Sequence, residues 1–207
     1  MKNRDKRRAF AASVAVCIGL ATVGCNHKNG ALQQPPAATQ QQSPATYVAA
    51  IDRYLTEQIG SQYGKGEDML PQGVAGEVVC IPCHTIVGVD EKDAGDIKVW
   101  GDFWVFNYRQ VGDTLKCVSG GNHPGLIHVR QTGEQFEVTG FDQVEDGSRF
   151  LPSAKRIFGD RFDAFQRINS DEKAREKTRA EAVAAFVKDH NIDAAMFQDY
   201  GWDPVKL

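Results

Sequence analysis

The chain lacks both a long apolar run and the short motifs that mark several large enzyme classes. A membrane-spanning helix needs ~20 consecutive apolar residues, and the longest apolar run, near the N-terminus, has only about fifteen. The Gly-x-Ser-x-Gly pattern of serine hydrolases, the His-Glu-x-x-His pattern of zinc proteases and the glycine loop that binds phosphates are all missing. The sequence therefore gives no support to those hydrolase and nucleotide-binding classes.

The chain also lacks an excess of positive charge. It has 24 lysines and arginines against 27 aspartates and glutamates, and residues 1–24 hold five of the basic residues and one of the acidic ones. Without that segment the formal net charge is about −7. A surface of this sign repels phosphate backbones, and no stripe of basic and aromatic residues is present, so nucleic acid is not an expected partner.

The N-terminus does contain a basic run followed by an apolar run that stops at a cysteine. Residues 2–8 hold the five basic residues, and residues 22–25 read Thr-Val-Gly-Cys. This order resembles the signal peptide of a bacterial lipoprotein. The resemblance implies a signal over residues 1–24, cleavage before Cys25, a lipid on the Cys25 thiol and a mature chain anchored to a membrane of the cell envelope.

Two alternatives for export stay open. Lipoprotein signals usually have leucine three residues before the cysteine, where this chain has Thr22, so an ordinary cleaved signal and a soluble periplasmic protein remain an alternative. The pair Arg7 and Arg8 resembles the start of a twin-arginine signal. Asn26 stands where lipoproteins kept at the inner membrane carry aspartate, and this analogy favours the outer membrane.

Residues 25–45 are rich in glutamine, alanine and proline and have almost no bulky apolar side chains. Such a segment cannot bury enough area to offset its chain entropy, which predicts a disordered tether. The remaining residues, 46–207, have the length of one domain.

The domain is predicted to begin with a helix and to continue as a sheet. Ser43 and Pro44 suit a helix cap and first turn, and the apolar residues between Tyr47 and Ile59 recur at helical spacing. Strand periodicity then predicts five strands, separated by turns too short for anything but antiparallel pairing. The predicted strands span residues 78–89, 97–108, 114–118, 126–131 and 135–142.

The second predicted strand is apolar on both faces near its middle, which places it centrally in the sheet. Helical spacing returns after Pro152 as one apolar stripe up to Ile168, and Asn169 and Ser170 are expected to cap a second helix over residues 171–190. Residues 193–202 are expected to form one short helix followed by packed aromatic residues.

This order of elements resembles the cystatin-like and NTF2-like group. The resemblance implies an α+β fold in which an N-terminal helix packs on a curved antiparallel sheet of four to five strands, followed by C-terminal helices. NTF2-like proteins often have a pocket between sheet and helix, but the group hosts enzymes, binders and assembly modules, so no functional residue transfers. The function expected is non-enzymatic binding of a small ligand or a protein partner, with no cofactor.

Residues 80–84, Cys-Ile-Pro-Cys-His, match the C-x-x-C-H pattern that attaches haem in c-type cytochromes. Haem c held by Cys80, Cys83 and His84 is therefore an alternative, and so is thiol-redox chemistry. Against both, the motif lies in a β-branched run that predicts a strand, whereas cytochromes place it on a helix and redox thiols lie at helix N-termini.

A structural disulfide is the simpler interpretation of the cysteines. In extended chain Cys80 and Cys83 lie ~10 Å apart, beyond the ~7 Å limit for a bridge, so we expect Cys117 to pair with one of them. A Cys80 to Cys83 bridge stays open if Pro82 turns the chain.

Two further candidate sites lie in the sheet region. His84, His123 and His128 could form an open zinc site, although their spacing carries no ligand signature and no metal is expected. Four aromatic residues at strand spacing could line a pocket, although aromatic stripes of this kind are usually core: Trp100, Trp104, Phe106 and Tyr108.

Overall fold

The protein is described by a computed structural model that covers residues 46–63, 78–199 and 201–207. The signal, Cys25 and the tether lie outside these residues, as does the cap expected at Ser43 and Pro44. The first helix, α1 (Tyr47–Tyr54), begins at Thr46, whose hydroxyl accepts a hydrogen bond of 3.2 Å from the Ala49 N–H. It continues as a π turn (Leu55–Ile59) and a 3-10 turn (Gly60–Gln62).

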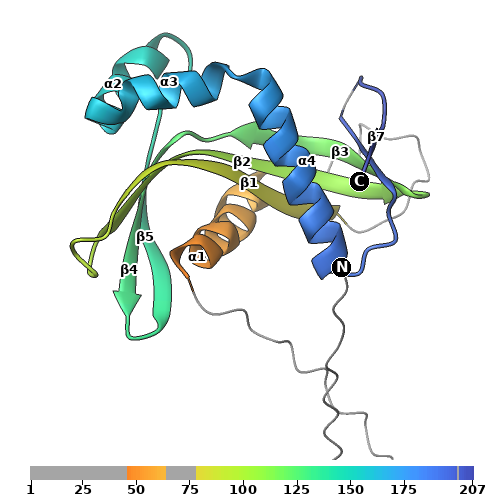
Figure 1. Cartoon of the computed structure of the whole chain (residues 1–207), viewed down its shortest axis with the longest axis horizontal. Helices are drawn as coiled ribbons and strands as arrows, with labels where there is room; N and C mark the ends of the chain where they lie inside the picture. Colours follow the sequence, from red (N-terminus) through yellow and green to blue (C-terminus); the bar gives the residue numbers. More distant parts are fainter. Residues whose placement is uncertain (1–45, 64–77, 200) are drawn as a thin grey trace, which may run out of the picture. The chain divides into compact units, whose positions relative to one another are not determined.

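Five long antiparallel strands follow, as the periodicity predicts (Figure 1). Strand β2 is central: β1 pairs along one of its edges, and its other edge pairs with β4 over residues 97–101 and with β3 over residues 104–111. The prediction of a central second strand is confirmed, since β2 is paired on both edges and buried on both faces. The strands are β1 (Val78–Asp90), β2 (Ile97–Val111), β3 (Thr114–Asn122), β4 (Gly125–Thr132) and β5 (Gln135–Gln143).

Two short C-terminal strands enlarge this sheet to seven strands and make it mixed. Strand β6 (Met196–Gln198) pairs parallel to β3, and β7 (Val205–Lys206) pairs antiparallel to β6. The short helix predicted within residues 193–202 is therefore wrong. The backbone N–H groups of Ala195 and Met196 donate to the Asp113 carbonyl, and Phe197 is buried, so tertiary pairing overrides local helix propensity.

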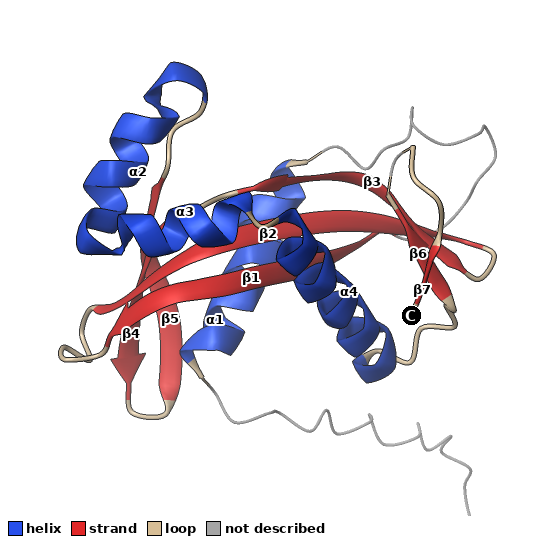
Figure 2. Ribbon diagram, turned by 45° about the horizontal axis from the view of Figure 1, so that its top comes forward, coloured by secondary structure: helices blue, strands red, loops and turns tan. Residues whose placement is uncertain are grey.

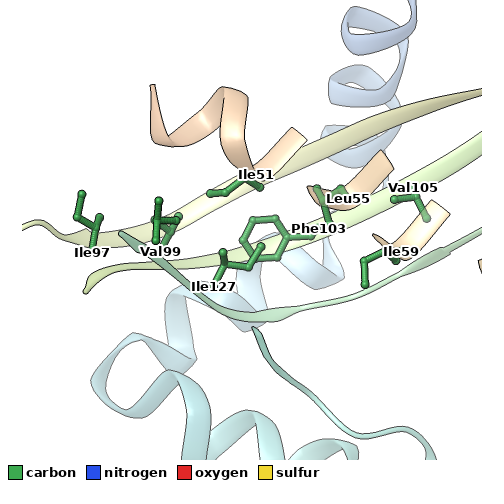
Figure 3. Packing of buried hydrophobic residues seen from close by; sticks show 9 residues of the cluster. Ile51, Leu55, Ile59, Ile97, Val99, Phe103, Val105 and Ile127 are labelled. Carbon is green, nitrogen blue, oxygen red and sulfur yellow. The ribbon is translucent and has the colours of Figure 1, made fainter. Parts of the chain in front are cut away.

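Side chains on alternate residues of β2 point to opposite faces of the sheet, and each face is covered by helix (Figure 2). On one face Val99, Phe103 and Val105 pack against Ile51 of α1 and Leu55 of the π turn, and Figure 3 shows this cluster. Because residues 51, 55 and 59 are spaced by four, one side of α1 and its π turn meets the sheet continuously.

Three helices cover the other face (Figures 1 and 2). They are α2 (Phe150–Phe158), α3 (Phe162–Ser170) and α4 (Glu172–Asp189). The single apolar stripe predicted before Ile168 is divided into two helices because Gly159 takes a positive φ of 50°. The expected cap of the last helix also shifts by one residue: the Asp171 carboxylate, not Asn169 or Ser170, accepts the Ala174 N–H.

The structure is thus α+β with a seven-stranded mixed sheet, where four to five antiparallel strands were expected. The described residues belong to one compact unit, residues 42–207. Among the helices described, none is long and apolar enough to pass through a bilayer.

Candidate functional site

A pocket of about 200 Å³ lies between α4 and the face of β1 and β2 that α4 covers. Residues from β1 and β2 line it on one side and the N-terminal half of α4 on the other, while Asp199 and Trp202 come from the C-terminal segment. The lining residues are Cys83, His84, Thr85, Asp102, Trp104, Phe106, Glu172, Arg175, Glu176, Thr178, Arg179, Asp199 and Trp202.

Two stacked aromatic rings form the strand side of this pocket. Trp104 and Phe106 are two residues apart on β2, so they share a face, and their rings lie 5.6 Å apart with an angle of 9° between the planes. Two arginines of α4 lie over these rings. Arg175 Cζ is 5.5 Å from the Trp104 ring centre and Arg179 Cζ is 3.7 Å from that of Phe106.

The residue spacing along β2 and α4 explains why each arginine lies over one ring. Residues two apart on a strand are separated by ~6.6 Å, and residues four apart on a helix by ~6 Å along the axis, so each arginine meets one ring.

Arg179 is fully engaged in interactions within the protein. Its guanidinium forms a bidentate ion pair with the Asp199 carboxylate, and its Nε–H donates to the Tyr108 hydroxyl at 2.9 Å. Burial raises the pKa of Asp199 above its ordinary value, although Arg179 opposes that shift. Burial likewise raises the pKa of Tyr108. Arg179 therefore ties the segment that carries β6 to α4 rather than offering a free cation to the pocket.

Asp102 is the most buried charged residue of the pocket, with 1% of its surface exposed. Its two oxygens accept hydrogen bonds from the Trp104 indole N–H at 3.1 Å and from the Asn122 amide at 2.6 Å. Both donors are neutral, and no ion pair reaches this carboxylate from the part of the chain that the structure describes.

Sequence reasoning did not single out Asp102 or Arg179. The sequence does contain a clue to Asp102. It is a carboxylate within a run whose apolar residues predict a central buried strand, and a buried charge is costly unless it is paired and hydrogen-bonded. Arg179 gave no such signal, since basic residues are common on the charged helix that contains it.

The four aromatic candidates divide between pocket and core. Trp104 and Phe106 line the pocket, as that hypothesis requires. Trp100 instead packs with α2 and α3, where its indole N–H donates to the Ile157 carbonyl at 2.9 Å. Tyr108 is fully buried beneath Arg179.

The three cysteines of the described chain are free thiols, so the structure does not contain the expected disulfide. Cys80 faces α1, whereas Cys83 faces α4. Cys117 lies on the same face of the sheet as Cys83, but the two cysteines are on strands at opposite edges of β2. Cys83 pairs with Trp104 and Cys117 pairs with Tyr108, four residues further along β2, so the two thiols are too far apart to form a bridge.

The same geometry does not fit covalent haem. The two thiols of the C-x-x-C-H pattern lie on opposite faces of β1, so they cannot both reach the vinyl groups of one macrocycle. Burial raises the pKa of Cys80 to about 11 and that of Cys83 to about 12. Such thiols are protonated at neutral pH, which is opposite to the activated thiolate of redox sites.

The three histidines lie beside different residues. His84 Nδ1 lies 3.2 Å from Asp52 Oδ1 on α1, His123 Nε2 lies 2.8 Å from the Tyr63 hydroxyl, and His128 Nδ1 lies 2.6 Å from Asp96 Oδ1. Within residues 46–63, 78–199 and 201–207, no three histidine, cysteine or carboxylate side chains are grouped to hold a metal ion.

A second, wider hollow of about 490 Å³ lies on α2 and α3, lined in part by Phe150 and Phe162. Its charged residues, Asp163 and Arg167, are exposed. It lacks a buried polar group that would select a ligand, so the pocket under α4 is the stronger candidate site.

Comparison with protein-family models gave no match. Comparison with curated proteins and with solved structures gave none either.

Proposed function

We propose that this chain is a cell-envelope lipoprotein, anchored through Cys25, whose folded domain binds a small ligand in the pocket under α4 and catalyses no reaction. One observation carries the binding role: a buried carboxylate and a stacked pair of aromatic rings converge on one pocket. Ligand sites are typically concave, with aromatic side chains beside polar groups that fix the orientation of the ligand.

The chemistry of the pocket supports binding over catalysis. Its thiol, Cys83, is buried, and burial raises its pKa to about 12, so it is a poor nucleophile. Arg179 is already paired with Asp199, and Asp102 accepts two hydrogen bonds from neutral groups.

The signal-like N-terminus supports the proposal of a lipoprotein and of the outer membrane as its location. The relation to cystatin-like and NTF2-like folds stands on the order of one helix, five antiparallel strands and further helices. The ligand pocket proposed here differs from the usual NTF2-like one, because it lies on the face covered by α4 and not on the face covered by α1.

Saturation-transfer NMR of the full chain, with a panel of small aromatic fragments that are cationic, neutral or anionic, tests this function. We expect some fragments to bind and Thr178→Trp to abolish their binding, because Thr178 lines the pocket and the added ring would fill it. Lys177→Trp is the matched control, since the Lys177 side chain is 78% exposed and does not line the pocket. Binding that survives Thr178→Trp, or no binding by any fragment, would contradict the proposal.

A further inference from the structure

The buried carboxylate of Asp102 indicates what kind of ligand the pocket favours. A desolvated carboxylate is costly unless charged or strong donors compensate it, and Asp102 has only two neutral donors. Each carboxylate oxygen can accept more than one hydrogen bond, so Asp102 retains acceptor capacity toward the pocket that it lines.

The other charges of the pocket have the same sign on balance. Four carboxylates line it (Asp102, Glu172, Glu176 and Asp199) against two guanidiniums (Arg175 and Arg179), which is a net charge of −2 when His84 is neutral. Since Asp199 and Arg179 neutralise each other, Asp102 and the two glutamates face a single remaining cation, Arg175. Throughout the residues that the structure covers, neither glutamate forms an ion pair.

The aromatic rings of the pocket favour cations as well. Trp104 and Phe106 each already have a guanidinium over the ring, which shows that these faces suit positive charge. Trp202 lines the same pocket and is 69% exposed, so its ring has surface left to cover a ligand. The volume of about 200 Å³ is below the ~300 to 1,000 Å³ of drug-sized sites, so the ligand is small.

We propose that the pocket binds a small organic cation, in which a primary ammonium group donates hydrogen bonds to Asp102 and a short apolar group contacts Trp104 and Trp202. Glu172 and Glu176 would attract the cation to the pocket. This inference rests on the proposed function, because it names the ligand class of the same pocket.

Three probes of one shape test the charge preference by calorimetric titration of the full chain: phenethylamine, 2-phenylethanol and 3-phenylpropionate. The ammonium should bind at least about tenfold more tightly than the alcohol, since a hydrogen bond to a charged group is the stronger kind. The carboxylate should bind more weakly than the alcohol, because it meets Asp102 and the two glutamates.

Variants identify the group responsible. Asp102→Asn should weaken binding of phenethylamine about tenfold and change that of 2-phenylethanol less than about twofold. If Asp102→Asn does not fold, as judged by near-ultraviolet circular dichroism, Glu176→Gln replaces it and should weaken the ammonium selectively by about twofold. Glu181→Gln is the matched control on α4, since Glu181 is 67% exposed and does not line the pocket.

The outcomes separate this inference from the function on which it rests. Equal affinity for the ammonium and the alcohol, with both lost in Thr178→Trp, would overturn the cation preference and leave the binding site standing. Tighter binding of the carboxylate would also overturn it. No binding by these probes or by any fragment of the wider panel would contradict both proposals.

Discussion

At the scale of single residues, burial decides the chemistry of the cysteines. Cys80 and Cys83 are three residues apart on β1, so their side chains enter different cores on opposite faces of the sheet. Each thiol is removed from water, which disfavours the thiolate and raises its pKa. A motif that reads as reactive in the sequence is therefore unreactive in the fold.

These thiols predict a loss of stability at alkaline pH. The ordinary thiol pKa of 9.0 rises to about 11 for Cys80 and about 12 for Cys83 in the folded chain. Below pH 9 both states keep the proton and stability is unaffected; between pH 9 and the folded pKa values only the unfolded state loses it, so stability falls. We expect a loss of about 1 kcal/mol per thiol by pH 10, measured by urea denaturation at a series of pH values.

The matched variant is Cys83→Ala, which removes one of the titrating groups. Its free energy of unfolding should be lower than that of the wild type at pH 7, because the side chain is buried, but should fall less steeply above pH 9. Parallel pH profiles for the two proteins would contradict this account.

At the scale of secondary-structure elements, the 3-10 turn that follows α1 lies close to β1, where Gly60 meets Cys80. A side chain at position 60 would overlap the Cys80 sulfur, although its φ of −61° suits any residue. Asn107 reinforces this approach from β2, because its amide donates to the Gly60 carbonyl at 3.1 Å.

Gly60→Ala should therefore destabilise the protein despite the better helix propensity of alanine. We expect a loss of about 1 to 3 kcal/mol from overpacking, measured by thermal and urea denaturation. The double variant Gly60→Ala with Cys80→Ala should recover part of this loss, because the two Cβ atoms would be 3.4 Å apart. Gly140→Ala is the control, with its nearest neighbour at 3.8 Å, and should be close to neutral. A stabilised Gly60→Ala would mean that the 3-10 turn does not pack on β1 as described.

The ion pair of Arg179 and Asp199 holds the β6 segment onto α4. Its side chains are 14% and 32% exposed, so removing one partner leaves a poorly solvated charge. We expect Asp199→Ala to lower the free energy of unfolding by about 3 kcal/mol, and Arg179→Met with Asp199→Leu to restore most of it, measured by urea denaturation.

Glu181→Ala is the comparison for Asp199→Ala, since it breaks the exposed pair with Lys177 and should cost less than about 0.5 kcal/mol. Equal costs for Asp199→Ala and Glu181→Ala would show that the Arg179 pair is solvated and does not anchor β6.

At the scale of the whole molecule, lipidation predicts a membrane-bound chain although no described helix could span a bilayer. Radiolabelled palmitate should label the wild type and not Cys25→Ala, because Cys25 is the proposed acceptor. Cys17→Ala is the matched control, since Cys17 lies within the proposed signal and should not affect labelling. Label retained by Cys25→Ala, or absent from the wild type, would rule out lipidation at this residue and leave export open.

Local patterns in the sequence determined most of the sheet and its helices. The alternation that predicts strands over residues 78–89 and 135–142 and the glycine turns between them act over a few residues, so these strands were predicted closely. The central position of β2 in the sheet was also predictable, because a strand that is buried on both faces carries apolar residues on both.

Only the tertiary structure decided β6, the state of the cysteines and the composition of the pocket. β6 forms because its backbone pairs with the edge of β3 and because Phe197 is buried there. Local propensity encodes neither of these interactions. The pocket depends on Asp102 of β2, Arg175 of α4 and Trp202 of the C-terminal segment meeting in space. Contacts between residues so distant in the chain leave no periodic trace in the sequence, whereas strand and helix periods do.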